Sequence, residues 1–318
     1  MSGDRNVLEP QFSVVIACYN QENFVREAVD SVLVQAGSRC EVIAVDDASR
    51  DGTADVLRGY GSHILFARPE KNLGASGARN FGASLARGEY LVFLDGDDAL
   101  APWALDVYES LVQRRPEMIL AHSRKCQNTL PEAARAEAPD AIQFAEYPEF
   151  LEKDRSWVYN SSSLIVRRKT FLAAGGWTQG LFYQDIQDLL LKLSVAGKTI
   201  LVHSPETVWY RMHGTNAVGK VQPFVEGIFL LLAKARRKEY PGDGWRRAAW
   251  LGGLAFYWCK TSLTHGLPLQ ALRLLARTWW MIGLAALRRA RCWVAGRSPL
   301  QKIQIVRTRQ EASVGQKS

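Results

Sequence analysis

The first hundred residues alternate between short apolar runs and segments with helical periodicity. Apolar runs of this length, bounded by Gly, Asp or Asn, are typical of strands buried on both faces of a sheet. Strands that alternate with helices indicate βαβ units, so the pattern predicts an α/β fold with a parallel sheet covered on both faces. The predicted strands are residues 13–18, 41–46, 63–68 and 90–95, and the predicted helices are residues 22–35, 53–60 and 74–86.

The middle of the chain continues this pattern less regularly. Residues 161–166 and 199–202 are predicted strands, and residues 186–196 form a predicted helix between them. The segment 131–148 is rich in Ala and Glu and has few large apolar side chains, which favours a loop or an insertion.

The composition changes near residue 220, where the sequence becomes helical and rich in Trp and Arg. We therefore expect a first domain over residues 1–220, followed by a helical region over residues 221–300. The last residues, 301–318, are polar and are predicted to be disordered.

The whole chain has the composition of a folded protein from a reducing compartment. Hydrophobic residues are 47% and charged residues 23% of the 318, which excludes intrinsic disorder. The five cysteines are scattered without a C-x-x-C spacing, so neither a disulfide framework nor a zinc site is expected. The first residues are too polar for a signal peptide, and the longest apolar stretches are shorter than the roughly 20 residues of a spanning helix. We expect a cytoplasmic location, which includes the inner face of the cytoplasmic membrane.

One predicted strand ends on a cluster of carboxylates. Its apolar run, residues 90–94, is followed directly by Asp95, Gly96, Asp97 and Asp98. Three anions in one short turn repel one another and raise one another's pKa unless a cation lies among them. Hard oxygen ligands suit Mg²⁺ or Mn²⁺. The cluster therefore indicates a divalent metal site, and the alternative is a solvated Asp-Gly turn.

Polar residues also follow the other predicted strands. Tyr19 and Asn20 follow the first strand, and Asp46 and Asp47 end the second. Ligands of α/β sheets bind beyond the carboxyl ends of the strands, so these groups are expected to meet at one rim. The sequence contains neither G-x-G-x-x-G after a strand nor G-x-x-x-x-G-K-[ST]. The sequence therefore lacks the phosphate-binding loop of a dinucleotide enzyme and that of a P-loop phosphotransferase, which argues against both classes.

Four segments, in order along the chain, resemble the inverting family two glycosyltransferases. The segments are VVIACYN at 14–20, VDDASRDGT at 45–53, NLGASGARN at 72–80 and LDGDD at 94–98. The resemblance covers about residues 12–216. It implies a GT-A fold, an α/β architecture in which a Rossmann-like mixed sheet is flanked by helices, here with a helical C-terminal extension. It also implies a nucleotide-sugar donor and Mn²⁺ or Mg²⁺ as the cofactor.

The resemblance assigns donor contacts to residues of these segments. Tyr19 and Asn20 are expected to bind the nucleobase end of the donor, where an aromatic ring can stack at a worth of about 1 kcal/mol. Asp47 is expected to accept a hydrogen bond from the base imide, which favours uracil or thymine. Arg79 is expected to reach a donor phosphate, because its guanidinium matches two oxygens at once. Without the resemblance, the same residues suit a core tyrosine, a helix-capping aspartate and a solvated arginine.

Asp95 and Asp97 correspond to the D-x-D motif of the family, with Gly96 between them. The resemblance implies that Asp95 contacts the donor ribose or a metal-bound water, and that Asp97 ligates the metal that bridges the two phosphates. Such a metal neutralises the charge that grows on the leaving nucleoside diphosphate. Asp98 is a further candidate in the same cluster.

The catalytic base is expected later in the chain. Trp177 ends a Gly-Gly-Trp segment, and residues 183–193 read YQDIQDLLLKL, which resembles the family's E-D-x-x-[LW] motif. By this resemblance Asp185 opens a helix and takes the proton of the acceptor hydroxyl. Gln184 stands where the family has Glu, and we expect its amide to donate a hydrogen bond that orients the base. Asp188, one turn later, is the rival base, and the helix dipole alone also favours an aspartate at a helix N-terminus.

Residues 209–216, WYRMHGTN, resemble the Y-R-x-H-x-x-N end of many family members. His213 is expected to complete the metal or diphosphate site as a neutral imidazole, and Arg211 to contact phosphate. The alternative for the histidine is a structural role in its loop. The serines 161–163 are expected to line the acceptor pocket or, alternatively, to form a polar strand edge.

The C-terminal region is basic and aromatic. The formal net charge of +8 suits nucleic acid, an anionic membrane or a phosphorylated substrate. Residues 270–292 combine Leu, Ile and Trp at helical spacing with five arginines, which favours a helix in an anionic headgroup layer and not a nucleic-acid partner. We expect peripheral membrane contact through residues 245–297, and the alternative is a helix that packs on its own domain.

The sequence therefore predicts an inverting, metal-dependent glycosyltransferase that uses a UDP- or dTDP-sugar. The predicted acceptor is a hydroxyl of a glycan, including a lipid-linked glycan, in the synthesis of a cell-surface polysaccharide or glycoconjugate. The alternative is a non-catalytic nucleotide-sugar or glycan-binding scaffold of the same fold, with Gln184 as a sign of lost activity. A sugar-phosphate nucleotidyltransferase should carry a Gly-rich basic loop after its first strand, and residues 19–22 are not such a loop.

Overall fold

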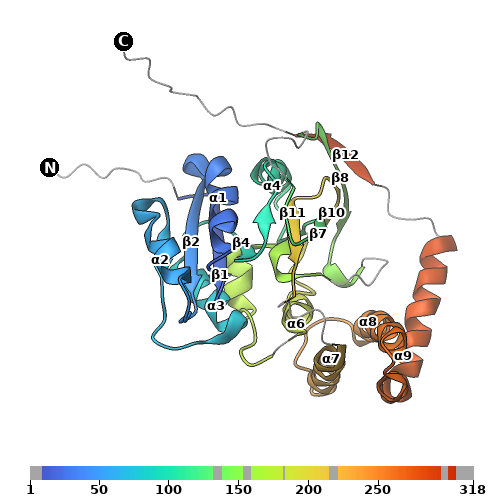
Figure 1. Ribbon diagram of the computed structural model, residues 1–318. Coiled ribbons are helices and arrows are strands. Elements are labelled where there is room, and N and C mark those ends of the chain that lie inside the picture. Colours follow the sequence, from blue (N-terminus) through green and yellow to red (C-terminus); the bar gives the residue numbers. More distant parts are fainter. Residues whose placement is uncertain are drawn as a thin grey trace, which may run out of the picture.

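A computed structural model gives the structure of residues 9–131, 138–152, 159–181, 183–214, 221–294 and 300–305. Its first half is the predicted series of parallel strands and helices (Figure 1). The strands are parallel neighbours in the order β4-β1-β2-β3. Their bounds are β1 (Phe12–Cys18), β2 (Cys40–Asp46), β3 (Leu65–Ala67) and β4 (Tyr90–Asp95). The register pairs Cys18 with Asp46 and Ala17 with Asp95, so the carboxyl ends of three strands meet at one rim.

The second half turns this sheet into a mixed one. Among the described residues the sheet has nine strands, in the order β12-β8-β10-β6-β9-β4-β1-β2-β3. The parallel arrangement predicted for the first hundred residues ends at β4, because β9 runs antiparallel to both β4 and β6, and β8 runs antiparallel to β10 and β12. The sheet as a whole is therefore mixed, as the family resemblance implies. The added strands are β6 (Met118–Leu120), β8 (Ala141–Tyr147), β9 (Leu164–Arg167), β10 (Thr199–Ser204) and β12 (Gln301–Gln304).

Two of these strands contradict the sequence-based expectations. The segment 131–148 was expected to be a loop or an insertion, but β8 lies within it as a strand of the large sheet and buries Ile142 and Phe144 in the core. The tail 301–318 was expected to be disordered, but β12 pairs with β8 at the edge of the sheet. Residues 132–137 and 306–318 lie outside the described residues.

A second, three-stranded sheet lies next to the D-x-D turn. Strand β5 (Ala99–Leu100) follows that turn directly and pairs with β11 (Val208–Met212), which also pairs with β7 (Ser123–Gln127). This pairing brings the segment after β11, which carries His213, back to the end of β4. Asn216 lies outside the described residues.

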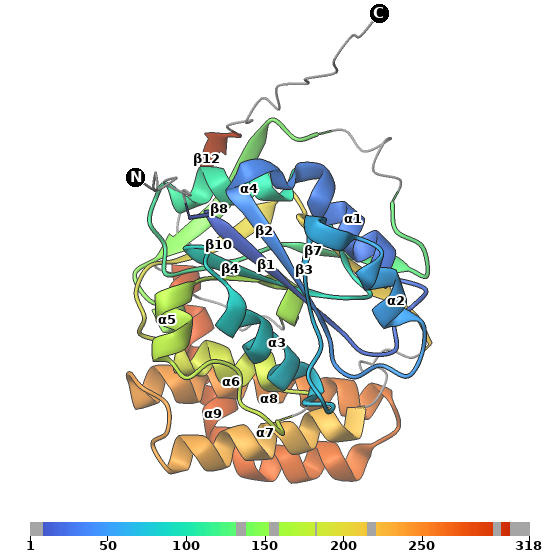
Figure 2. The ribbon, with the colours of Figure 1, turned by 90° about the vertical axis from the view of Figure 1, so that its left-hand side faces the viewer.

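Helices cover both faces of the large sheet (Figure 2). One face packs against α1 (Val25–Ala36), α2 (Thr53–Arg58) and α4 (Ala104–Val112). The other face packs against α3 (Gly74–Leu85), α5 (Arg168–Ala173) and α6 (Asp185–Lys192). Gly82 allows α3 to approach closely, because a Cβ at this position would collide with the side chain of Val15 in β1. The sheet is thus buried on both sides, as the continuous apolar runs predict.

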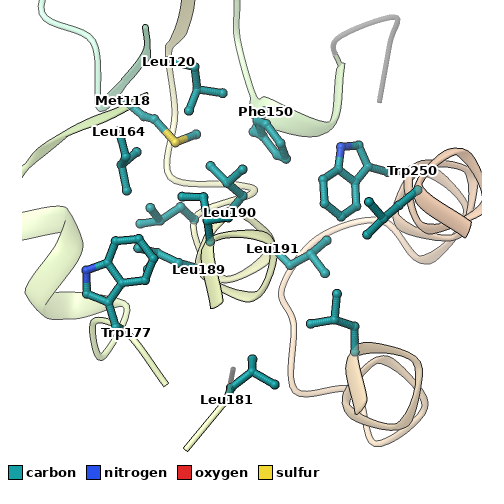
Figure 3. Packing of buried hydrophobic residues seen from close by; sticks show 14 of the residues in the cluster. Met118, Leu120, Phe150, Leu164, Trp177, Leu181, Leu189, Leu190, Leu191 and Trp250 are labelled. Carbon is teal, nitrogen blue, oxygen red and sulfur yellow. The ribbon is translucent and has the colours of Figure 1, made fainter. Parts of the chain in front are cut away.

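The C-terminal helices extend the second face instead of forming a core of their own. They are α7 (Val221–Arg236), α8 (Gly244–Thr264) and α9 (Pro268–Val294). Figure 3 shows the leucines of α6 between Met118 and Trp177 on the sheet side and Trp250 of α8 on the other. The composition changes near residue 220, but the hydrophobic cluster continues across that point.

Helix α9 packs along α8, and Gly252 makes the close crossing possible because a Cβ there would collide with the backbone of Met281. No helix among the described residues is both long enough and apolar enough to cross a bilayer.

Candidate functional site

The D-x-D turn is fixed by the end of β1. The Gly96 amide donates to the carbonyl of Ala17 at 3.0 Å, and the Asp98 amide donates to the carbonyl of Asp95 at 3.0 Å. A Cβ at Gly96 would lie 2.7 Å from the Cys18 sulfur and would overlap the side chain of Gln21. The glycine between the two aspartates is therefore required by space, which makes it part of the site's framework.

Asp97 and His213 meet at this turn. The Nε2 atom of His213 lies 2.9 Å from Asp97 Oδ2, and the imidazole stacks on Phe24 with ring centroids 4.7 Å apart. Burial, followed by the neighbouring charge of Asp95, raises the pKa of Asp97, and the contact with His213 opposes that rise. The sequence predicted that these two residues share one site, and the structure places them in contact.

Asp98 points into the protein instead of toward the rim. Its side chain is buried and accepts hydrogen bonds from the Ser162 hydroxyl at 2.6 Å and from the Arg211 amide at 3.0 Å. Burial, with the charges of Asp97 and Asp95, raises the pKa of Asp98 well above its usual value. The geometry therefore gives Asp98 a structural role, because its side chain connects the turn after β4 with β11 and with Ser162.

Arg211 is held by other groups of the protein. Its guanidinium is buried, donates to the carbonyl oxygens of Asp97 and Asn128 at 2.9 Å each, pairs with Glu27 and lies over the ring of Phe24. The expected phosphate contact does not fit this arrangement. The side chain instead fixes the backbone of the D-x-D turn.

Arg79 links two carboxylates that are far apart in the sequence. Its guanidinium lies 2.6 Å from Asp95 Oδ1 and 2.8 Å from Asp185 Oδ2, and it donates to the Ser161 hydroxyl at 2.8 Å. Burial alone would lower the pKa of Arg79, but the two carboxylates raise it above its ordinary value. The expected role as a phosphate ligand is thus replaced in this structure by a bridge between the D-x-D turn and the start of α6.

Trp177 packs against the guanidinium of Arg79 in this bridge. The indole is fully buried, lies edge-on to Phe93 at 5.2 Å, and faces the Arg79 guanidinium 4.9 Å from its ring centroid. The Asn80 side chain pairs with both the amide and the carbonyl of Trp177, at 2.9 and 2.8 Å. The Gly-Gly-Trp segment therefore positions Arg79 and is not itself a ligand surface.

Asp185 is the first residue of α6, and its side chain remains partly accessible. Gln184 does not orient it as expected, because the Gln184 amide donates instead to the carbonyl of Phe224 in α7 at 3.1 Å.

Asp188 is fully buried and bonded to Thr178, Lys234 and Tyr240. An aspartate enclosed in this way cannot reach an acceptor hydroxyl, so the geometry favours Asp185 over its rival as the base.

The residues expected at the nucleobase lie at the ends of β1 and β2. Tyr19 is 43% exposed, whereas Asp47 is buried and accepts from the Leu73 amide at 2.7 Å. Asn20 has a left-handed backbone with φ of 54°, and its side chain accepts from the Arg50 amide at 2.8 Å. Burial raises the pKa of Asp47. The Tyr19 side chain is therefore exposed, whereas the Leu73 amide holds the Asp47 carboxylate in place.

The chemistry of a divalent cation fits the Asp97 and His213 pair. In the described parts of the chain, no group of three or more His, Cys, Asp or Glu side chains is arranged to hold a metal. Mg²⁺ commonly takes only one or two carboxylates from the protein, and its other ligands are substrate phosphates and water. Burial and the neighbouring charge of Asp95 raise the pKa of Asp97, and a bound cation would stabilise its ionised form.

Several residues of this site were not assigned their observed contacts from the sequence. Asn80 follows Arg79 directly and could have been found as the end of the NLGASGARN segment. Ser162 lies among the serines expected at the acceptor pocket, but its hydroxyl serves Asp98 and the Asp95 amide. Phe24 and Glu27 lie on or next to α1, where nothing in the pattern marks them.

Comparisons with known proteins identify a family and a fold. The family described as "Glycosyl transferase family 2" matches residues 13–174. An uncharacterized glycosyltransferase of Haemophilus influenzae is 28% identical over 182 residues, which are 57% of this chain and 61% of the relative. The putative teichuronic acid biosynthesis glycosyltransferase TuaG of Bacillus subtilis is 33% identical over 146 residues, which are 43% of this chain and 56% of the relative. The chain therefore spans between 56 and 61% of the length of these two relatives.

The fold is similar to that of a solved structure over most of its length. The crystal structure of S. aureus TarS 1–349 in complex with UDP-GlcNAc superposes with a TM-score of 0.65 at 17% identity, covering 87% of this chain and 83% of that chain. This similarity shows that the architecture is the GT-A fold, as the sequence predicts.

Proposed function

Because this chain belongs to glycosyl transferase family 2, we propose that it is an inverting, metal-dependent glycosyltransferase that transfers a sugar from a UDP- or dTDP-sugar to a glycan hydroxyl. The observation that carries the proposal is the bridge from Asp95 through Arg79 to Asp185. It brings the D-x-D turn, where a leaving diphosphate would be held, next to a partly accessible carboxylate at the start of a helix.

Asp185 is proposed as the general base. Its carboxylate takes the proton of the acceptor hydroxyl while the acceptor oxygen forms a bond to the anomeric carbon of the donor sugar. The bond from that carbon to the diphosphate oxygen breaks on the opposite side, so the anomeric configuration inverts. Arg79 occupies one oxygen of Asp185 at 2.8 Å, and the Ile186 amide donates to the other at 2.9 Å. A carboxylate has about four acceptor positions, so these bonds orient the base and leave room for the acceptor.

Asp97 and His213 are proposed to hold Mn²⁺ or Mg²⁺, with Asp95 beside them. When bound, the cation would neutralise charge on the leaving diphosphate. In the protein itself, the Asp97 carboxylate and the His213 imidazole face each other at 2.9 Å. Phe24 stacks on the imidazole, and Arg211 donates a hydrogen bond to the Asp97 carbonyl, so both partners are held in place.

The donor base is proposed to stack on Tyr19, next to Asn20, and to donate its imide N–H to Asp47. The backbone amide of Leu73 already fixes the Asp47 carboxylate at 2.7 Å, and its remaining acceptor positions suit the single imide donor of uracil or thymine. The structure of TarS in complex with UDP-GlcNAc supports a uridine nucleotide for this fold.

The acceptor is proposed to be a glycan of a cell-surface polysaccharide or glycoconjugate, presented as a lipid-linked molecule at the inner face of the cytoplasmic membrane. The description of TuaG as a putative teichuronic acid biosynthesis glycosyltransferase supports a polysaccharide product. The basic, Trp-rich C-terminal helices support the membrane location.

The deciding experiment compares the wild type with Asp185→Asn on a panel of UDP- and dTDP-sugars with Mn²⁺. Loss of a general base costs typically 10²- to 10⁴-fold, so we expect about that loss in donor turnover while the thermal shift caused by the donor remains. Asp55→Asn, on the exposed side of α2, is the matched control and should keep full activity.

An Asp185→Asn variant with full turnover would disprove the assigned base. A wild type that binds donor but shows neither transfer nor slow donor hydrolysis would instead be a non-catalytic scaffold. Product stereochemistry, read by NMR of the anomeric proton, tests inversion separately.

A further inference from the structure

The structure exposes an apolar face along α9 from Leu269 to Leu287. Six large apolar side chains of this helix are between 41 and 75% exposed, and at 100° per residue their positions fall on one side of the helix. We call this set the α9 outer face; its members are Leu269, Leu272, Leu275, Trp279, Trp280 and Leu287. The opposite side of α9, which includes Leu274, Thr278 and Met281, is buried. The helix is therefore apolar on the side that packs and also on the side that faces solvent.

A face of this kind needs a partner, because isolated soluble proteins rarely expose a continuous apolar stripe. Figures 1 and 2 place α7, α8 and α9 together at one end of the molecule, beyond α6 and away from α1 and α2. Because the side chains of the α9 outer face are exposed, the face is accessible to a large surface.

Charge identifies the partner. Between Val221 and Val294 the sequence has 12 Lys and Arg but only three acidic residues, so this segment accounts for the whole positive charge of the protein. On a helix with 100° per residue, Trp280 lies at one edge of the α9 outer face. Arg273 and Arg291 come next to Trp280 around the helix, and Arg277 follows them. The Arg273 and Arg277 guanidiniums lie 5.8 and 4.4 Å from the ring centroid of Phe229 in α7, which holds both cations at this edge.

We propose that the α9 outer face is a docking surface for a membrane rich in anionic lipid, with the leucines and tryptophans in the headgroup boundary and the arginines on phosphate groups. A second copy of this chain would present the same arginines to one another, and like charges across an interface are repulsive. An anionic bilayer satisfies both the apolar stripe and its cationic border. The inference rests on the proposed function only for the idea of a membrane-borne acceptor, and it can fail or succeed independently of it.

The test is sedimentation of the full chain with vesicles of phosphatidylcholine alone and with vesicles in which about a third of the phosphatidylcholine is replaced by the anionic lipid phosphatidylglycerol. We expect binding to the anionic vesicles that weakens with added salt. The triple variant Leu272→Ser, Trp279→Ser, Leu287→Ser should lose at least about tenfold in partitioning, since each removed side chain is worth more than one buried CH₂ group. The double variant Arg273→Gln, Arg291→Gln should lose about 30-fold on anionic vesicles only, at about 1 kcal/mol per charge.

The matched control is the triple variant Val34→Ser, Leu65→Ser, Leu172→Ser, which removes exposed apolar side chains elsewhere on the surface and should bind vesicles like the wild type. Donor hydrolysis in solution should be the same in all variants, which separates this test from that of the proposed function.

Equal vesicle binding by wild type and the α9 triple variant would overturn the proposal. A second outcome would also overturn it. If the wild type is a dimer in analytical ultracentrifugation and does not bind vesicles, and the α9 triple variant is a monomer, the face is an interface between two copies of this chain.

Discussion

Asp97 and Asp98 are adjacent in the chain, yet the fold gives them opposite environments. Asp97 faces His213 at the rim, whereas Asp98 is enclosed between Ser162 and the Arg211 amide. Burial raises the pKa of both side chains, and for Asp98 the rise is large. The first carboxylate is therefore suited to a cation, and the second to a neutral, hydrogen-bonded role.

This difference predicts opposite results for two matched substitutions. Asp97→Asn should reduce donor turnover with Mn²⁺ by about 100-fold or more, because an amide cannot replace an anionic ligand. Asp98→Asn should reduce it by less than about tenfold, because Asn has the shape and hydrogen-bonding groups of a protonated aspartate. Steady-state donor hydrolysis at several Mn²⁺ concentrations measures both. Equal losses in the two variants would show that both aspartates act as anions at the site.

At the scale of elements, α6 is braced by α7 on both sides of the proposed base. Gln184, just before Asp185, donates to the Phe224 carbonyl, and Asp188, one turn after it, pairs with Lys234. Burial alone would raise the pKa of Asp188, but hydrogen bonds from Lys234, Thr178 and Tyr240 outweigh burial and hold the pKa below its ordinary value. The helical region therefore contributes directly to where the proposed catalytic helix begins.

Removing the cation from this buried pair should be costly. Lys234→Met leaves the buried Asp188 carboxylate with Lys192, whose Nζ lies 3.6 Å from Asp188 Oδ2, as its remaining ion partner. We therefore expect a loss of about 3 kcal/mol in the free energy of unfolding at pH 7, the lower end of the range for a broken buried ion pair. Urea unfolding measures this loss, and Lys169→Met on the exposed side of α5 is the matched control. A loss below about 1 kcal/mol would mean that α6 is not held by this pair.

The same pair fixes the sign of a pH effect. A carboxylate whose folded pKa is lowered stabilises the protein above its unfolded pKa of about 4, and this contribution disappears as the pH falls through the folded value. The difference in unfolding free energy between wild type and Lys234→Met should therefore shrink as the pH is lowered from 7 toward 3. A difference that stays constant over this range would exclude the ionised pair as its source.

For the whole molecule, the sequence predicted what is local and missed what depends on distant partners. The apolar runs of β1 to β4 and the aspartates that follow them are contiguous, so their positions could be predicted. Strand β8 was missed because an Ala- and Glu-rich context hides the buried Ile142 and Phe144. The pairing of Arg79 with Asp185 and of Gln184 with the Phe224 carbonyl was also missed. These contacts join segments that only the folded chain brings together.

The shared core leads to a last prediction, that the chain unfolds as one unit although its composition divides near residue 220. Leu189, Leu190 and Leu191 of α6 lie between the sheet and α8, and Trp250 of α8 packs edge-on against Phe150 at 5.7 Å (Figure 3). A helical region that formed its own domain would melt separately, whereas a region that shares one hydrophobic cluster should melt with the sheet. Differential scanning calorimetry of the full chain should therefore show one cooperative transition. A chain that ends at residue 220 should lose its sharp transition and bind a hydrophobic dye, because the α7 and α8 side of α6 becomes exposed. Two resolved transitions in the full chain, with the truncated chain retaining one of them, would show that the helices are an independent domain.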